Sequence, residues 1–177
     1  MFPLLISAAL TASPPAAVEQ PKRIGIRLNP PPQMPRALIA AMMRDTERRW
    51  AFPSLKLHWH GHGEPCPGPD HRLVIVEFHG RCTLHRFPDA SSRRTLGYTH
   101  VSEGYVLPFI GIDCDAIAAS VAKVSPALSP FLNVNVFGRA LAAVLTHEMI
   151  HALTESGRHE AAGVMQPNLT PRDLTEP

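Results

Sequence analysis

The chain has 177 residues, of which 45% are apolar and 18% are charged, and its formal net charge is +2. A chain of this length and composition predicts one globular domain with its own hydrophobic core, since it is too short for two domains of ordinary size. This net charge is too small to indicate binding to nucleic acid or to an anionic membrane, and neither partner is expected.

The N-terminal segment has an apolar run from Phe2 to Ala12, followed by small residues. This run resembles the apolar part of a secretory signal, although no basic residue precedes it. We expect a signal peptide or disordered leader over residues 1–20, a single domain over residues 21–177, and export to the periplasm or the medium. The alternative is a leader on a cytoplasmic protein. Because about 20 apolar residues are needed to cross a bilayer, no stable membrane insertion is expected.

The first half of the chain predicts three strands and one helix. Lys22 to Leu28 alternates as a strand does, and Arg36 to Trp50 repeats apolar residues at helical spacing behind Pro35, which suits a first helical turn. Leu55 to His60 alternates strictly, and Arg72 to His79 is a β-branched run typical of a buried strand.

The strand at Leu55 to His60 would place His58, His60 and His62 together on the face turned away from the core. Three histidines on one face could bind a metal ion. Such a row is more often a solvated strand face, and we favour that interpretation.

The second half predicts a loop, a strand and two helices. Residues 86–103, rich in Ser, Arg, Asp and Gly, predict a long surface loop. Gly104 to Ile112 is apolar but contains Pro108, which cannot donate a ladder hydrogen bond and therefore predicts an edge strand. A short helix from Ala116 to Lys123 and a long one from Phe137 to Leu153 follow. This order is typical of an α+β domain with helices packed on a mixed sheet.

Cys66, Cys82 and Cys114 are too widely spaced for the close cysteine pairs of a zinc site. Structural burial is the favoured interpretation. An exported protein could also pair two of them and leave one free, and the sequence does not say which.

The long helix carries the pattern HExxH, His147 to His151. Residues four apart lie on one helix face, so the two histidines can offer ring nitrogens to one ion. Glu148 projects about 100° further round the helix and can act as general base on the water that a metal acidifies. The alternative is a polar helix end at which histidines favour the C-terminal dipole.

A catalytic zinc ion usually takes three protein ligands. Glu155 cannot join His147 on one ion, because eight residues of helix rise about 12 Å. Ser156-Gly157 predicts a break in the helix, since glycine accepts the left-handed conformation that ends helices. The chain can then turn back, and His159 is the predicted third ligand of Zn²⁺.

These residues together resemble the zinc site of metzincin-type metallopeptidases. His147 to His151, a glycine turn, His159 and then Gly163-Val164-Met165-Gln166-Pro167 follow the order of that site, and the chain looks like a small bacterial variant with an eight-residue step to the third histidine. It departs from the usual string at Thr154, which stands where the family has glycine, and the third histidine is displaced by two residues. The resemblance implies a zincin-like fold, a twisted mixed β-sheet with a long active-site helix carrying HExxH.

The resemblance also implies an activity. The protein would be a zinc-dependent, metalloendopeptidase-like hydrolase that cleaves peptide or protein substrates, with Glu148 as general base. Met165 would be the methionine of the turn beneath the metal, the alternative being plain core packing. Gly104 to Ile112 would pair with an extended substrate. The oxyanion donor could be any of three side chains, Tyr98, His100 or Tyr105.

Two other classes explain part of the pattern. A non-catalytic zinc-binding module of the same fold would use the three histidines, but a structural site would close the fourth coordination position and would not need Glu148. Metal-dependent ribonucleases that use three histidines lack a glutamate directly after the first, and the near-neutral charge disfavours RNA. The sequence does not define the oligomeric state or the substrate preference.

Overall fold

A computed structural model describes residues 22–50, 52–61, 63–65, 72–85, 95–124 and 133–176. The expected leader over residues 1–20, together with His62 and Cys66, lies outside these residues. Among the helices described, none is both long enough and apolar enough to cross a membrane.

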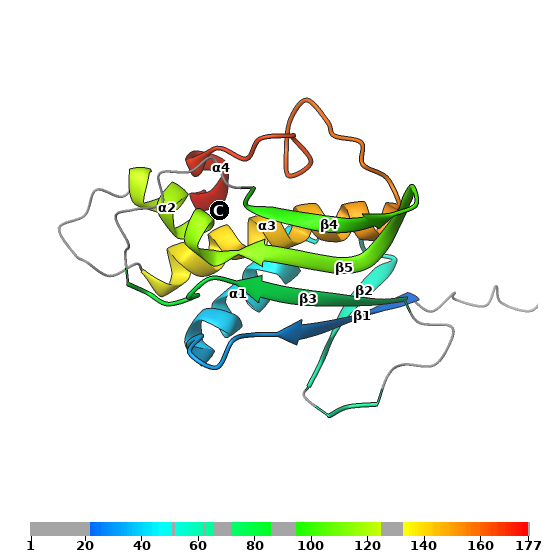
Figure 1. Cartoon of the computed structure of the whole chain (residues 1–177), viewed down its shortest axis with the longest axis horizontal. Coiled ribbons are helices and arrows are strands. Elements are labelled where there is room, and N and C mark those ends of the chain that lie inside the picture. The colour runs from blue at the N-terminus through cyan, green and yellow to red at the C-terminus, as the bar shows by residue number, and fades with distance from the viewer. Residues whose placement is uncertain are drawn as a thin grey trace, which may run out of the picture.

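Five strands form one sheet in the spatial order β2-β1-β3-β5-β4 (Figure 1). Their bounds are β1 Lys22–Asn29, β2 Leu55–His60, β3 Arg72–His79, β4 Gly97–Ser102 and β5 Tyr105–Asp113. Parallel pairing joins β1 to β2 and to β3, and β3 to β5, whereas β4 runs antiparallel to β5. The protein is therefore an α+β domain with a mixed sheet, as the element order predicts.

The described helices are α1 Arg36–Arg49, α2 Cys114–Val124, α3 Val134–Thr154 and α4 Pro171–Thr175. Helices α1 and α3 lie side by side behind the sheet (Figure 1). They approach closely at Gly138, where an added Cβ would stand 2.5 Å from the Cβ of Ala41. A larger residue at position 138 would force the two helices apart.

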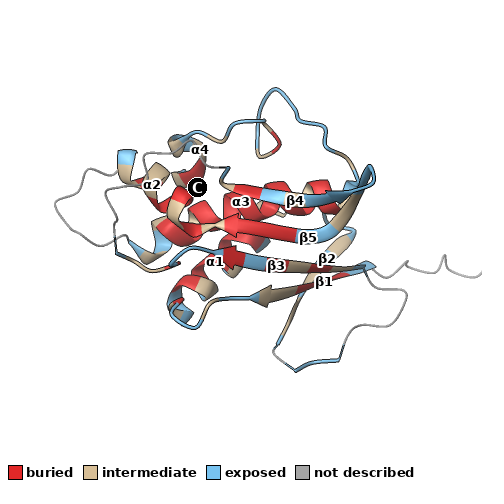
Figure 2. Ribbon diagram, viewed as in Figure 1, coloured by how far each residue is buried: buried red, intermediate tan, exposed pale blue. Residues whose placement is uncertain are grey.

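The core lies between the sheet and these two helices, and α3 is buried along most of its length (Figure 2). Alternate residues of the central strands and the facing stripes of α1 and α3 form it; they include Ile24, Ile26, Val74, Val76, Ile110, Ile112, Leu38, Met42, Leu141 and Leu145. Burying one side chain of this kind contributes about 1.5–3 kcal/mol. Packing against the sheet therefore holds α3, and the side chains that it carries, in a fixed position.

The structure corrects two expectations about the sheet. Gly97–Ser102 is strand β4, where a loop is predicted, and β5 lies between β3 and β4, where an edge strand is predicted. Pro108 is tolerated inside the sheet because the β4–β5 pairing is irregular between Thr99 and Val101, and the β3–β5 pairing begins only at Phe109. At such an irregularity the missing N–H of proline leaves no strand-to-strand hydrogen bond unmade, since none is required there. The edge strand on this side is β4.

Cys82 and Cys114 form a disulfide, and both residues are buried. The bond joins the segment after β3 to the first residue of α2. The predicted burial is confirmed for these two cysteines, and the structure selects the pair that the sequence leaves open.

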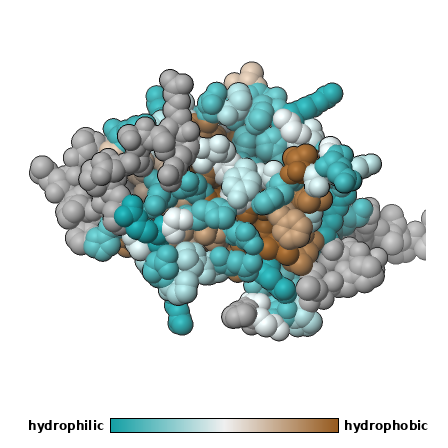
Figure 3. All heavy atoms as spheres, viewed as in Figure 1, coloured by the Kyte–Doolittle hydropathy of each residue, from teal (hydrophilic) through white to brown (hydrophobic). Residues whose placement is uncertain are grey.

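The face of the sheet opposite α1 and α3 is called the outer face here, and no described helix covers it (Figure 1). Its surface mixes polar and apolar side chains (Figure 3). The strict alternation of β2 is confirmed, because Leu55, Leu57 and Trp59 pack against the core. His58 and His60 therefore lie on the outer face, as predicted. The favoured interpretation of a solvated face holds for His58, whose side chain is 53% exposed, but is wrong for His60, whose side chain is 7% exposed.

Candidate metal centre

Helix α3 brings HExxH into the interior of the molecule. Asn133 caps its first turn, with Oδ1 accepting hydrogen bonds from the backbone N–H groups of Asn135 and Val136. Towards the other end of the helix, His147, Glu148 and His151 are 7%, 6% and 7% exposed. An exposed polar helix end, the alternative weighed from the sequence, is inconsistent with this burial.

The helix ends earlier than Gly157. Its C-cap is Glu155 in the left-handed conformation, with φ 52° and ψ 34°, whereas Gly157 has no positive φ. The backbone N–H groups of Glu155 and Ser156 both donate to the carbonyl of His151, which closes the last turn. The chain does turn back after the helix, as predicted, but the left-handed residue that ends the helix is Glu155 and not Gly157.

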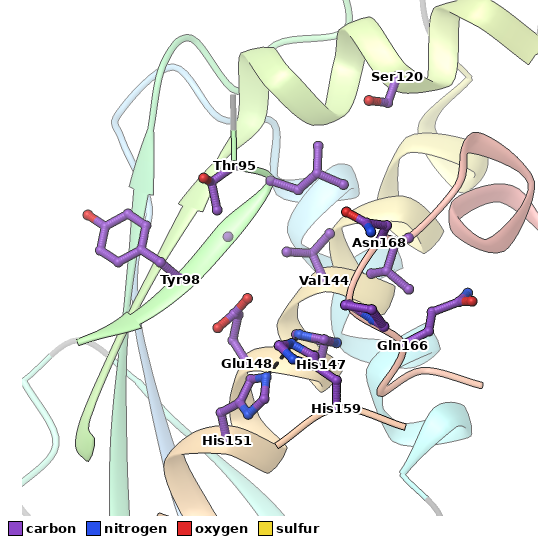
Figure 4. A pocket seen from close by; sticks show the side chains of 14 residues that line it. Thr95, Tyr98, Ser120, Val144, His147, Glu148, His151, His159, Gln166 and Asn168 are labelled. Atoms are coloured by element: carbon purple, nitrogen blue, oxygen red, sulfur yellow. Dashed lines mark hydrogen bonds between the residues drawn. The ribbon is translucent and has the colours of Figure 1, made fainter. Parts of the chain in front are cut away.

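The returning chain brings His159 beside the other two histidines (Figure 4). The ring centroids are 4.6 Å apart for His147 and His151, 5.2 Å for His147 and His159, and 4.9 Å for His151 and His159. One nitrogen from each ring lies within 4.8 Å of the others. This group, the α3 cluster, could hold a metal ion.

The hydrogen bonds of the α3 cluster define which ring nitrogens are free. His147 Nδ1 lies 2.7 Å from the carbonyl oxygen of Val164, and His151 Nδ1 lies 2.6 Å from that of Ser156. A carbonyl oxygen only accepts, so both Nδ1 atoms donate and carry the ring proton. In the neutral rings both Nε2 atoms then present lone pairs.

These two lone pairs face each other, because His147 Nε2 and His151 Nε2 are 3.0 Å apart. Two unprotonated nitrogens repel at this distance unless a cation lies between them. Two nitrogens bound to one tetrahedral ion at about 2.0–2.1 Å stand about 3.3 Å apart. Burial also lowers the pKa of His147, which disfavours a proton as that cation. The donor set therefore fits a metal ion.

Glu148 is buried beside the histidines and is held by strand β4. The Thr99 hydroxyl lies 2.8 Å from Glu148 Oε2 and 3.1 Å from the Glu148 carbonyl oxygen, so it can donate to either. Burial raises the pKa of Glu148, and the hydrogen bond from Thr99 partly opposes this by favouring the ionised form. A raised pKa is suited to a group that both accepts and returns a proton.

Strand β4 can approach Glu148 this closely because residue 97 is glycine. A Cβ at Gly97 would stand 2.5 Å from Val144 Cγ1 and 3.1 Å from Glu148 Cγ. Any side chain here would push β4 away from α3. Thr99 is not among the residues predicted for the site. The alternation of Gly97 to Val101 indicates which residues share a face of the strand, but not that Thr99 contacts Glu148.

A cavity of about 610 Å³ opens in front of the α3 cluster. Its lining comes from β4 and the residues before it, from α2 and α3, and from the chain after α3: Thr95, Leu96, Gly97, Tyr98, Ser120, Val144, His147, Glu148, His151, His159, Gln166, Pro167, Asn168 and Leu169. The volume is in the range of small-molecule and cofactor sites.

Residues 163–166 form a turn below this cavity. Gln166 N–H donates to the carbonyl of Gly163, which has φ 80°, and Met165 is buried at 9% exposure. The carbonyl of Val164, in the same turn, is the acceptor for His147. The assignment of Met165 beneath a metal stays a prediction, while its turn does contact a histidine of the cluster.

The three oxyanion candidates do not lie with the histidines. The Tyr98 side chain points away from them (Figure 4), and its hydroxyl is 3.0 Å from His79 Nε2. The His100 ring lies beside that of Tyr98, with centroids 5.1 Å apart and the ring planes tilted by 60°, and Tyr105 is 74% exposed. The side chains of Gln166 and Asn168 line the cavity instead (Figure 4).

Comparison of the chain with protein-family models finds no match, and comparison with curated proteins finds none. The case for a function therefore depends on the geometry of the α3 cluster.

Proposed function

We propose that the protein is a zinc-dependent metallopeptidase with a zincin-like fold, similar to the metzincins. The observation that carries this proposal is the 3.0 Å distance between the buried Nε2 atoms of His147 and His151. The Nδ1 of each ring donates a hydrogen bond to a backbone carbonyl, and the buried Glu148 lies beside them. Carbonyl partners of this kind orient metal-binding histidines and fix their tautomer. The turn at residues 163–166 and the mixed sheet add support.

His147, His151 and His159 would hold the zinc ion. Three imidazoles form a usual catalytic set, and no fourth His, Cys, Asp or Glu joins the group among the described residues. Zinc in such a site acts as a Lewis acid that polarises a carbonyl and lowers the pKa of water. This chemistry suits hydrolysis of a peptide bond.

Glu148 would act as general base. Its carboxylate, oriented by Thr99, accepts a proton from the attacking water and later returns it to the leaving amine. Gln166 and Asn168 lie on the other side of the cavity and offer amide donors to a developing oxyanion.

Strand β4 would position the substrate. It is the edge of the sheet, and Gly97 and Tyr98 line the cavity. An extended peptide can add to such an edge through backbone hydrogen bonds, which brings a main-chain carbonyl over the metal site. This role replaces the one that the sequence assigns to Gly104 to Ile112, since that segment is largely interior strand β5.

We also propose that the protein works outside the cytoplasm. The disulfide between Cys82 and Cys114 supports this, because such bonds persist in oxidising compartments. The apolar run at Phe2 to Ala12 is consistent with a signal sequence. Fractionation of cells that express the full chain with a C-terminal epitope tests this: recovery of the chain in the cytoplasm alone would contradict export.

The function is tested by zinc analysis and proteolysis on the full chain. The wild-type protein should contain zinc and cleave casein or a peptide library, and cleavage should stop with a chelator and return with added Zn²⁺. Glu148→Ala should keep zinc at the α3 cluster and lose cleavage. Zinc without cleavage in either protein would indicate a non-catalytic zinc module, and cleavage of RNA but not of peptides would indicate a ribonuclease.

A further inference from the structure

The outer face of the sheet, which is turned away from α3, carries a second group of side chains of the kinds that bind metals. It consists of His58 and His60 on β2 and Glu64, three residues after the Gly61 that follows the strand. One ligand atom from each lies within 4.8 Å of the other two. We call this group the β2 cluster. From its geometry we propose a second metal site, which binds a divalent ion of the zinc class.

The distances suit a shared ion. His60 Nδ1 is 3.3 Å and His58 Nε2 is 4.0 Å from Glu64 Oε2. Ligand atoms around one ion with bonds of about 2.0–2.2 Å stand about 3–4 Å apart. Two imidazoles and one carboxylate are a donor set for zinc and similar transition metals, since calcium and magnesium prefer oxygen ligands alone.

The second observation is the state of His60. Its side chain is only 7% exposed, and its buried Nδ1 has no hydrogen-bond partner. A buried polar nitrogen without a partner is costly, so it normally has a ligand or a water. This nitrogen is the atom that faces Glu64 Oε2. A metal ion between them would satisfy both.

The backbone around the cluster places these groups. Gly25 on the neighbouring strand β1 leaves room for the His60 ring, because a Cβ there would stand 2.6 Å from His60 Nε2. The carbonyl of Glu64 accepts a 2.7 Å hydrogen bond from Arg27 Nη2, and its N–H donates to the carbonyl of Gly61. Glu64 is therefore fixed over the strand before any ion binds.

The rival explanation is a plain ion pair between Glu64 and a protonated histidine. If the group is only an ion pair, replacing Glu64 or the histidines should leave zinc binding unchanged. The second site predicts instead that Glu64 and both histidines raise the affinity for zinc. The proposal does not depend on peptidase activity, because the two clusters lie on different faces of the sheet.

Zinc binding to the full chain distinguishes these explanations. Apo protein titrated with Zn²⁺ against a chromophoric chelator should bind two equivalents. His58→Ala/Glu64→Gln should bind one, as should His147→Ala/His151→Ala, and the fourfold variant should bind none. The matched control is His100→Ala/Glu103→Gln on and beside β4, which makes the same chemical changes and should keep both equivalents.

Two outcomes would overturn the proposal. Wild type that binds a single equivalent, lost only in His147→Ala/His151→Ala, would exclude the second site. So would two equivalents that remain in His58→Ala/Glu64→Gln with affinity changed by less than about tenfold. Because His58 and Glu64 side chains are 53% and 50% exposed, the variant should fold. A second measurement uses wild type alone: Zn²⁺ should shift or broaden the imidazole NMR signals of His58 and His60.

Discussion

The α3 cluster and the β2 cluster contain similar donors in different surroundings. In the α3 cluster, His147 and His151 are buried and a backbone carbonyl fixes each ring. In the β2 cluster, His58 is half exposed, and His60 has a buried nitrogen that lacks such a partner. On the two proposals made above, prior orientation of the rings and an adjacent buried carboxylate would distinguish the catalytic site from the site that only binds an ion.

The largest expected effect comes from Glu148→Gln. It keeps the shape of the side chain but removes the proton acceptor, so the peptidase rate should fall by about 10²–10⁴-fold. Zinc content measured on the same samples should stay at the wild-type level. Glu77→Gln, the same change on an exposed strand residue, is the control. An equal loss of rate in Glu64→Gln would break the comparison between the clusters.

Gly97→Ala should give the next largest effect. The added methyl group would stand 2.5 Å from Val144 Cγ1 and would move β4 relative to Glu148. A displacement of about 1 Å at a catalytic group can cost about 10²-fold in rate, and the overpacking should lower the free energy of unfolding by about 1–3 kcal/mol. Kinetics and chemical denaturation measure the two effects.

Gly25→Ala is the counterpart of that change in the β2 cluster. Its methyl group would displace the His60 ring, so zinc binding on the outer face should weaken while peptidase activity stays at the wild-type level. A loss of activity in Gly25→Ala like that in Gly97→Ala would show that the two clusters are coupled.

Thr99→Val should have a smaller effect that depends on pH. Glu148 must be ionised to accept a proton, and the Thr99 hydroxyl favours the ionised form. Without this hydrogen bond the pKa of Glu148 rises, so the acidic limb of the activity profile should move to higher pH. At an acidic pH, where Glu148 is only partly ionised, the rate of Thr99→Val should be about tenfold lower than that of wild type, since a hydrogen bond to a charged group contributes about 1.5 kcal/mol. Thr99→Ser should keep the wild-type profile, and a limb that does not move in Thr99→Val would contradict this role.

Asn133→Ala should have the smallest effect. It removes the N-cap of α3, far along the helix from the histidines, and should cost about 1 kcal/mol of stability. Zinc content at both clusters and the peptidase rate should not change. Thermal unfolding measures the cost, and a fall in rate at a temperature where the variant is folded would show that the site responds to general loss of stability.

The sequence predicts the local elements well because their signals are local. The 3.6-residue period of Phe137 to Leu153 and the alternation of Leu55 to His60 are both confirmed. The step from His151 to His159 could also be predicted, since a rigid helix excludes Glu155 and the chain has to turn.

The errors concern long-range pairing and one rare conformation. The sequence does not show that β4 pairs outside β5, because strand neighbours depend on contacts far along the chain. The role of Thr99 could not be predicted for the same reason, since its partner is Glu148 on α3. The helix ends at Glu155 because hydrogen bonds to His151 hold a left-handed glutamate, a conformation uncommon outside glycine.

The contacts around the α3 cluster differ in how far apart their residues lie along the chain, and this difference has a consequence for folding. The contacts that shape the α3 cluster join residues 4, 5 and 17 positions apart, whereas Thr99 and Glu148 are 49 apart. Short chain loops close early and at low entropic cost. On the proposed function, the C-terminal segment would bind zinc before β4 has docked, and such a partly folded chain would still lack the hydrogen bond from Thr99 that positions Glu148. Zinc content at the α3 cluster would then report the order of α3 and of the turn at residues 163–166, while only turnover would report that β4 has docked on the sheet.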